Sequence, residues 1–115
     1  MQPPRSKTDA LGAVPMPRPE IRTRITDQGL VRISYPATLA PWIARLIPGS
    51  FTLPVRTLEL DAMGTYVWNL IDGTASVHDL ARHVATHYAC HPAEAEQAVA
   101  AFVRQLGQRG ILGLR

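Results

Sequence analysis

The sequence predicts an α+β fold in which a three-stranded antiparallel sheet is followed by three helices. Two observations support this order. Residues 20–60 contain three runs in which apolar and polar residues alternate with period two, as in half-buried strands. Residues 61–110 instead repeat apolar residues with helical spacing, between capping and helix-breaking residues. A group of strands followed by a group of helices is typical of α+β domains.

The first two alternating runs, residues 20–26 and 30–35, predict a β-hairpin around the turn signal Asp27-Gln28-Gly29. In each run one face should be half-buried and the other should carry the arginines. The residues expected on the half-buried faces are Ile21, Thr23, Ile25, Val31, Ile33 and Tyr35. The residues expected on the polar face are Arg22, Arg24 and Arg32.

Residues 55–60 alternate in the same way and predict the third strand. Because successive side chains of a strand point to opposite faces, this strand should present two different rows. One row consists of Val55, Thr57 and Glu59. The other row consists of Arg56, Leu58 and Leu60.

Three helices are expected after the strands, and the residues at their N-termini mark where they begin. Asp61 is a good N-cap for a helix that ends near Ile71. Ser76 should cap the second helix, and Asp79 three residues later resembles a capping box. Pro92 suits the first turn of the third helix. Left-handed glycines are expected to follow the first and third helices, at Gly73 and Gly110.

Each expected helix carries an apolar stripe that should face the core. The three stripes are Met63, Val67, Leu70 and Ile71; then Val77, Leu80, Ala81, Val84 and Tyr88; then Ala95, Val99, Phe102, Val103 and Leu106. Three apolar residues near the C-terminus should return to the core or add a short edge strand. These are Ile111, Leu112 and Leu114.

Prolines divide the chain into regions. Residues 1–19 hold five of the ten prolines and show no apolar periodicity, which predicts a disordered arm before a domain over residues 20–115. Residues 36–54 form an apolar, proline-rich connection. We favour a flap that folds over the core, and a docking patch is the alternative. The apolar residues at issue are Trp42, Ile43, Leu46, Ile47 and Phe51.

Composition excludes several classes of protein. Cys90 is the only cysteine, so a disulfide-stapled secreted fold is excluded. No apolar stretch reaches the roughly 18 residues of a spanning helix, and the first residues do not form a signal peptide. We therefore expect a cytoplasmic protein without membrane contact. The net charge of +3 combines +5 in residues 1–58 with −2 in residues 59–115, which suggests an acidic partner on the N-terminal side.

One cluster has the residue types of a metal site. His83 and His87 are four residues apart on the second expected helix, and Cys90 and His91 follow at its end. Imidazole and thiolate ligands suit zinc or copper. However, the helical spacing places both of these helix histidines away from the core stripe, where histidines are usually solvent-facing. We therefore expect no metal ion and no other cofactor, and we keep His83, His87 and Cys90 as the metal candidates.

The chain shows no phosphate-binding loop, nucleophile elbow or pair of carboxylates on one expected face, so we do not expect an enzyme. A binding role is suggested instead by the third strand. An exposed strand edge is a template on which a peptide can add as a further strand. Ala98 and Ala101, with Glu94 and Gln105, line one flank of the third helix and would leave a shallow trough beside the sheet. The alternative is that the alanines are simply good helix formers.

The residues after Leu58 resemble the PqqD-like family, the peptide-recognition domains of pathways that modify ribosomal peptides. The resemblance is carried by Leu60-Asp61-Ala62-Met63-Gly64-Thr65-Tyr66-Val67-Trp68-Asn69-Leu70-Ile71-Asp72-Gly73-Thr74. It continues through Val77-His78-Asp79-Leu80, Tyr88, Pro92-Ala93-Glu94-Ala95-Glu96, Phe102-Val103-Arg104-Gln105-Leu106 and Gly110-Ile111-Leu112. It covers about residues 20–114, and the long connection at 36–54 departs from the shortest members.

This resemblance implies a winged-helix-like domain without catalytic activity. Such proteins bind the leader segment of a precursor peptide as a strand added to the third strand, in a cleft closed by the third helix. They present it to a modifying enzyme, often a radical enzyme that uses S-adenosylmethionine and iron–sulfur clusters. Carried over by position, the strand residues are Val55, Arg56, Thr57, Leu58 and Glu59. The helix residues are Glu94, Gln97, Ala98, Ala101, Arg104 and Gln105.

Two other functions stay open at this point. A winged-helix shape and a pI of 9.6 also suit nucleic-acid binding, but the third helix begins with Glu94 and Glu96 where a recognition helix normally presents basic residues. A metal-responsive module would use the histidine–cysteine cluster. An edge strand and an apolar connection also leave homodimer formation open.

Overall fold

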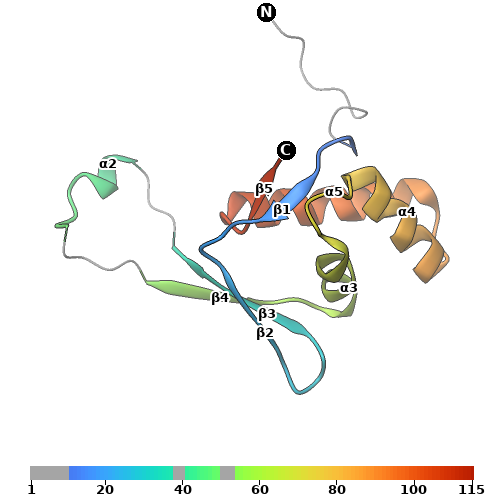
Figure 1. Ribbon diagram of the computed structural model, residues 1–115, viewed down its shortest axis with the longest axis horizontal. Coiled ribbons are helices and arrows are strands. Elements are labelled where there is room, and N and C mark those ends of the chain that lie inside the picture. Colours follow the sequence, from blue (N-terminus) through green and yellow to red (C-terminus); the bar gives the residue numbers. More distant parts are fainter. Residues whose placement is uncertain (1–10, 38–40, 50–53) are drawn as a thin grey trace, which may run out of the picture.

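The computed structural model describes residues 11–37, 41–49 and 54–115. Three long helices and a three-stranded antiparallel sheet confirm the predicted α+β fold, and a second, two-stranded sheet was not predicted (Figure 1). The elements, in chain order, are β1 (Pro15–Pro17), β2 (Arg22–Ile25), β3 (Val31–Pro36), α2 (Pro41–Ala44), β4 (Val55–Glu59), α3 (Ala62–Leu70), α4 (Val77–Tyr88), α5 (Pro92–Gln108) and β5 (Leu112–Leu114).

The larger sheet has the strand order β2-β3-β4, with both pairs antiparallel. The predicted hairpin is confirmed, and its register places Arg24 opposite Arg32. On the other side of β3, Ile33 lies opposite Leu58. Because residues directly opposite each other share a face, the three arginines of the hairpin share one face, as expected.

The prediction that β2 is half-buried is wrong. All four residues of β2 are exposed, and Ile25 retains 59% of its accessible surface. The buried core takes its sheet residues from β3, namely Val31, Ile33 and Tyr35, and none from β2. Alternation had indicated a strand with one apolar face, but the helices pack over β3 and leave β2 at an uncovered edge of the sheet (Figure 1).

The caps of α3 and α4 are those the sequence predicts, and the cap of α5 was not predicted. The Asp61 carboxylate accepts a hydrogen bond from the Gly64 N–H at 2.7 Å. Ser76 and Asp79 form both bonds of a capping box at the start of α4. His91 precedes Pro92 and caps α5, because its Nδ1 accepts from the Ala93 N–H at 3.0 Å.

The expected stripes of α4 and α5 form most of the core. Val77, Leu80 and Val84 of α4 are almost fully buried. Two positions differ from the prediction: Tyr88 is 38% exposed, and Phe102 is only partly buried. The chain then leaves α5 through Gly110, which has a φ of 77°, and enters β5. A left-handed glycine is the usual way to end a helix and turn the chain back.

Part of the expected N-terminal arm belongs to the fold. Residues 1–10 lie outside the described part of the chain, but β1 pairs with β5, with Pro15 opposite Leu114. The side chains of Ala13 and Pro15 are buried, and the Val77 N–H donates to the Ala13 carbonyl at 2.9 Å. Proline content had hidden this strand, although proline is tolerated in an edge strand where its missing N–H is not needed.

The connection between β3 and β4 does not fold over the core where the structure describes it. Trp42 of α2 is 66% exposed and Leu46 is 76% exposed, and neither contributes to the core. Figure 1 shows α2 at the far end of the molecule from the helices. The prediction of a flap is therefore wrong for these residues, and Phe51 lies outside the described residues.

Candidate functional site

The outer edge of β4 is open in the described part of the chain. β4 pairs with β3 along one side, and no described strand pairs with its other side. The Leu60 N–H donates to the Val31 carbonyl, and the Ala37 N–H donates to the Pro54 carbonyl. In an antiparallel ladder these bonded positions alternate with outward-pointing ones. The N–H and C=O groups of Val55, Thr57 and Glu59 therefore point away from β3.

The side chains of β4 are divided between the two faces as predicted. Arg56 lies opposite Tyr35 and Leu58 lies opposite Ile33, so both belong to the face of the sheet that the helices cover. The predicted second row lies on the outer face, opposite Pro36, Ser34 and Arg32. This row consists of Val55, Thr57 and Glu59. An added strand would meet a different chemical surface on each face.

A trough of about 210 Å³ lies between α3 and α5, next to the point where β4 ends. Three of the residues predicted for the helix wall line it, namely Ala98, Ala101 and Gln105. The remaining lining residues are Asp61, Met63, Gly64, Val67, Val99 and Phe102. Most of this surface is apolar, so the trough can accept an apolar side chain.

Gly64 explains how closely the two helices approach each other. A Cβ atom at this position would lie 3.2 Å from Cε1 of Phe102 and 3.1 Å from the Asp61 carboxylate. These distances are shorter than ordinary carbon contacts, so a Cβ atom here would require Phe102 or Asp61 to shift by a few tenths of an ångström. Met63, Gly64 and Phe102 were not among the site residues predicted from the sequence. Glycine in the middle of a helix normally destabilises that helix. Its presence at position 64 of an expected helix is the signal that could have indicated a close contact there.

The other predicted wall residues lie elsewhere on α5. Arg104 lines a separate groove on the opposite flank of the helix, together with Ala13 and Val77. Glu94 and Gln97 are exposed and line neither cavity. The helical spacing nevertheless places Glu94 on the trough flank, four residues before Ala98. The structure therefore brings together only part of the predicted set.

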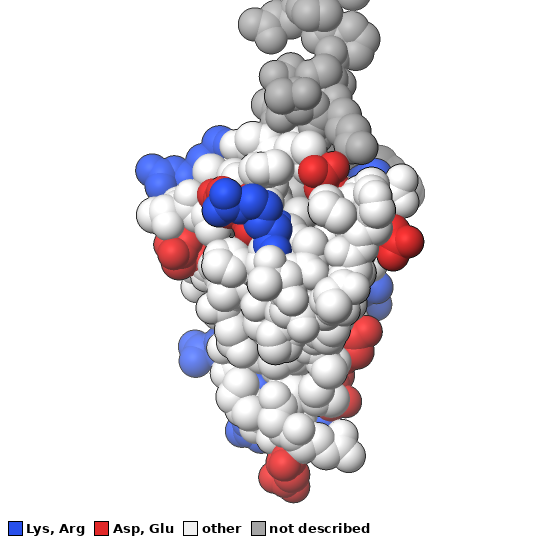
Figure 2. Space-filling model, turned by 90° about the vertical axis from the view of Figure 1, so that its right-hand side faces the viewer, with Lys and Arg blue, Asp and Glu red and all other residues white. Residues whose placement is uncertain are grey.

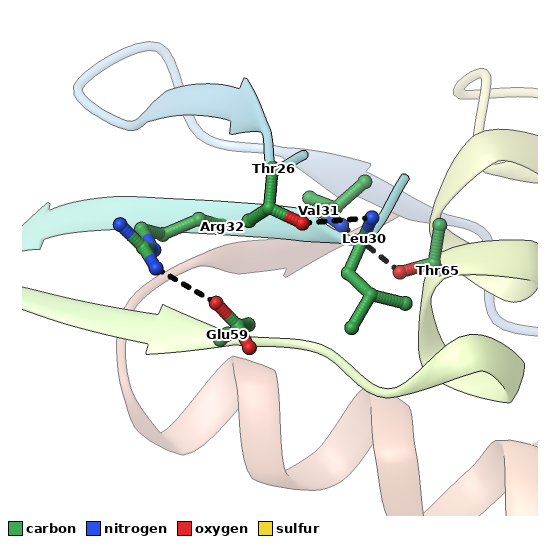
Figure 3. A network of polar contacts seen from close by, with 6 residues as sticks. All are labelled: Thr26, Leu30, Val31, Arg32, Glu59 and Thr65. Atoms are coloured by element: carbon green, nitrogen blue, oxygen red, sulfur yellow. Dashed lines mark hydrogen bonds and ion pairs between the residues drawn. The ribbon is translucent and has the colours of Figure 1, made fainter. Parts of the chain in front are cut away.

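Polar contacts fix the sheet to α3 beside the trough (Figure 3). The buried Thr65 hydroxyl accepts a hydrogen bond from the Val31 N–H at 3.0 Å. On the outer face of the sheet, Arg32 pairs with Glu59 at 2.8 Å. Arg22 and Arg24 share this outer face, so the expected row of basic residues does not face the trough.

Two basic residues lie near Tyr35, on the helix-facing side of the sheet. Arg109, the last-turn cap of α5, donates from Nη1 to the Tyr35 hydroxyl at 2.9 Å. Arg56 is the cross-strand neighbour of Tyr35 and is exposed. The described residues offer it no ion-pair partner. This end of the site is therefore positively charged.

The candidate metal ligands do not form a cluster. The His87 ring stacks on Tyr66 with 4.2 Å between ring centroids. His83 is exposed, and Cys90 is partly buried against the core. Throughout residues 11–37, 41–49 and 54–115, no three His, Cys, Asp or Glu side chains are grouped so that they could hold an ion. The spacing of His83, His87 and Cys90 in the sequence therefore does not bring them together as a set of metal ligands.

The charges on the surface do not form one basic field on the side of the molecule shown in Figure 2. Acidic and basic side chains surround a large uncharged area there. In the part of the chain that the structure describes, no helix is long and apolar enough to cross a membrane. The mixed charges in Figure 2 do not favour a polyanion as the partner of this face.

Comparisons with known proteins agree with this geometry. The family model of coenzyme PQQ synthesis protein D (PqqD) matches residues 50–112, which is more than half of the chain. No curated protein matches the chain. The chain is similar to the solution NMR structure of the PqqD truncation of PqqCD from Methylobacterium extorquens, a functional, stand-alone recognition element for ribosomally synthesised and post-translationally modified peptides. The TM-score is 0.60 at 24% identity, over 94% of this chain and 93% of that one, which shows that the two share a fold.

Proposed function

Because this chain belongs to the PqqD family, we propose that it is a non-catalytic adaptor that captures the leader segment of a ribosomally made precursor peptide. The leader adds as a strand to the outer edge of β4, and the adaptor presents it to a modifying enzyme. The observation that carries this proposal is the row of outward-pointing backbone groups at Val55, Thr57 and Glu59. Main-chain hydrogen bonds supply affinity in this mode of recognition, and side-chain pockets supply specificity.

The trough between α3 and α5 supplies such a pocket beside the open edge. Ala98, Ala101 and Gln105 form its α5 wall, and the two alanines are small enough to leave room for an apolar side chain of the leader. Arg56 and Leu58 flank the approach from the sheet. Arg104, Glu94 and Gln97 do not line the trough, so we leave them with a secondary role at most.

The modifying enzyme is the second partner of this adaptor. We propose an enzyme of the radical type that uses S-adenosylmethionine, since adaptors of this family often serve such enzymes. The adaptor itself carries no cofactor in this scheme. The ribosomal origin of the precursor favours a cytoplasmic location.

Strand addition can be tested with a proline at a position where only the guest would need the N–H. The Thr57 N–H points away from β3, so Thr57→Pro removes an outward donor and leaves the β3–β4 ladder intact. We expect weaker binding of a fluorescently labelled leader peptide of the cognate precursor. The lost hydrogen bond alone is worth about 0.5–1.5 kcal/mol, or roughly 2- to 12-fold in Kd. The free energy of unfolding should change little.

The matched control is Leu58→Pro, one residue further along the same strand. The Leu58 N–H belongs to the ladder with β3, so this variant should lose stability as well as binding. Unchanged leader affinity in Thr57→Pro would refute strand addition at β4. A gel shift with duplex DNA that depends steeply on salt would instead support the nucleic-acid alternative.

A further inference from the structure

The helix-facing side of the open β4 edge, from Arg56 to the trough between α3 and α5, differs in charge at its two ends, and we infer that this polarity selects leaders with the pattern apolar-x-apolar-x-acidic. The inference rests on the proposed strand addition and specifies which peptides it would accept. It concerns only the guest side chains that point toward the helices. Their surroundings are the trough at one end and Arg56 at the other.

The basic end of this edge is formed from two elements. Arg56 projects from β4, and Arg109 projects from the C-terminal end of α5 onto the Tyr35 hydroxyl at 2.9 Å. The structure describes no carboxylate that neutralises Arg56. A guest carboxylate placed opposite Arg56 would meet both guanidinium groups from the same side.

The other end of this edge, at the trough, is apolar and has carboxylates nearby. Met63, Val67 and Phe102 line the trough, and its volume of about 210 Å³ suits one large apolar side chain. Asp61 is one of its lining residues, and Glu94 lies one helical turn before Ala98 on the same flank of α5. These carboxylates would repel an acidic guest residue at this end, so the acidic residue belongs at the Arg56 end.

The strand geometry fixes the spacing between the two guest positions. Arg56, Leu58 and Leu60 share the helix-facing side, and the trough begins just beyond Leu60. Three alternate guest residues therefore face the helices, over about 14 Å from the first to the third. We assign an antiparallel guest, since antiparallel pairs are the more common. The guest then enters at the trough and reaches Arg56 four residues later.

The pattern can be tested with two peptides of identical composition. The first carries the core Leu-Thr-Leu-Thr-Glu, and the second carries Leu-Thr-Leu-Glu-Thr between the same flanking residues. A shift by one residue moves the carboxylate to the outer face of the sheet. Fluorescence anisotropy at low salt should show about two- to fivefold tighter binding of the first peptide, as for an exposed ion pair. High salt should reduce this difference.

Charge reversal identifies Arg56 as the reader of the carboxylate. In Arg56→Glu the preference should turn toward a Leu-Thr-Leu-Thr-Lys peptide, whereas Arg22→Glu, on the opposite face, should leave the wild-type preference unchanged. Equal affinity for the two isomeric peptides would overturn the inference and leave the adaptor proposal standing. The inference also fails, and the adaptor proposal also stands, if the leader of the cognate precursor binds and neither designed peptide does. If that leader also fails to bind, the proposed function itself is wrong.

Discussion

Thr65 shows how one side chain holds the sheet against the helix that builds the trough. It is 9% exposed, and its hydroxyl accepts from the Val31 N–H at 3.0 Å. The contact joins β3 to α3, two elements that are far apart in the sequence. A buried N–H without a partner costs far more than an average hydrogen bond contributes.

Replacing Thr65 should therefore destabilise the domain. Thr65→Val keeps the shape of the side chain and removes the acceptor, so we expect a loss of about 1–3 kcal/mol in the free energy of unfolding. Chemical denaturation followed by circular dichroism measures this loss. Thr65→Ser retains the hydroxyl and should recover most of the stability. If the serine variant is no more stable to unfolding than the valine variant, the hydrogen bond is not what stabilises this contact.

Single residues also show what the sequence could predict about the site. The cap at Asp61 was predictable because an N-cap is a local feature of three or four residues. The positions of Met63 and Phe102 in the trough could not be predicted, because they depend on how α3 and α5 pack against each other. Arg104 was placed in the wall by family position, but it lines the separate groove with Ala13 and Val77, and its role in binding stays a prediction.

At the scale of elements, two aspartates organise the turn between α3 and α4. The Thr74 and Ala75 N–H groups donate to the Asp72 carboxylate and lower its pKa. The Ser76 N–H, and after it the Ser76 hydroxyl, lower the pKa of Asp79. Hydrogen bonds to the charged form of a carboxylate favour that form.

These shifts predict how stability depends on pH. A carboxylate whose pKa is lower in the folded state stabilises the fold above its ordinary pKa of 3.8 and loses this contribution as the pH falls through the folded value. We therefore expect the free energy of unfolding to decrease as the pH falls below the ordinary pKa of 3.8. Asp72→Asn and Asp79→Asn should have a weaker dependence in denaturation curves recorded at several pH values. Curves that keep the slope of the wild type would contradict this assignment.

The elements also show where pattern reasoning fails. Alternation predicted the strands β2, β3 and β4 correctly, because it depends on the local direction of side chains. It did not predict that β2 would be exposed on both faces, since burial depends on which strands the helices cover. In the same way, the apolar connection before β4 did not cover the core where it is described, with Trp42 and Leu46 exposed.

At the scale of the whole molecule, the second sheet ties the two ends of the domain together. β1 pairs with β5, and Arg115 and Val14 exchange backbone hydrogen bonds at 2.9 and 3.5 Å. Pro15 is among the largest fully buried side chains. We therefore propose that the peptide-binding domain begins before residue 20 and includes β1, and that any separate arm is confined to the residues before it.

A pair of proline variants can test this boundary. Pro15→Asp places a carboxylate in a buried site without a partner and should lower the free energy of unfolding by about 2 kcal/mol or more. Pro17→Asp, two residues further along the same strand, is exposed and should change stability by only about 0.5 kcal/mol. Thermal denaturation of both variants shows whether β1 is part of the folded domain or of a detached arm. Equal, small effects would mean that β1 contributes nothing to the folded domain and that a detached arm extends to residue 19, because a charge on a solvated chain costs nothing on folding.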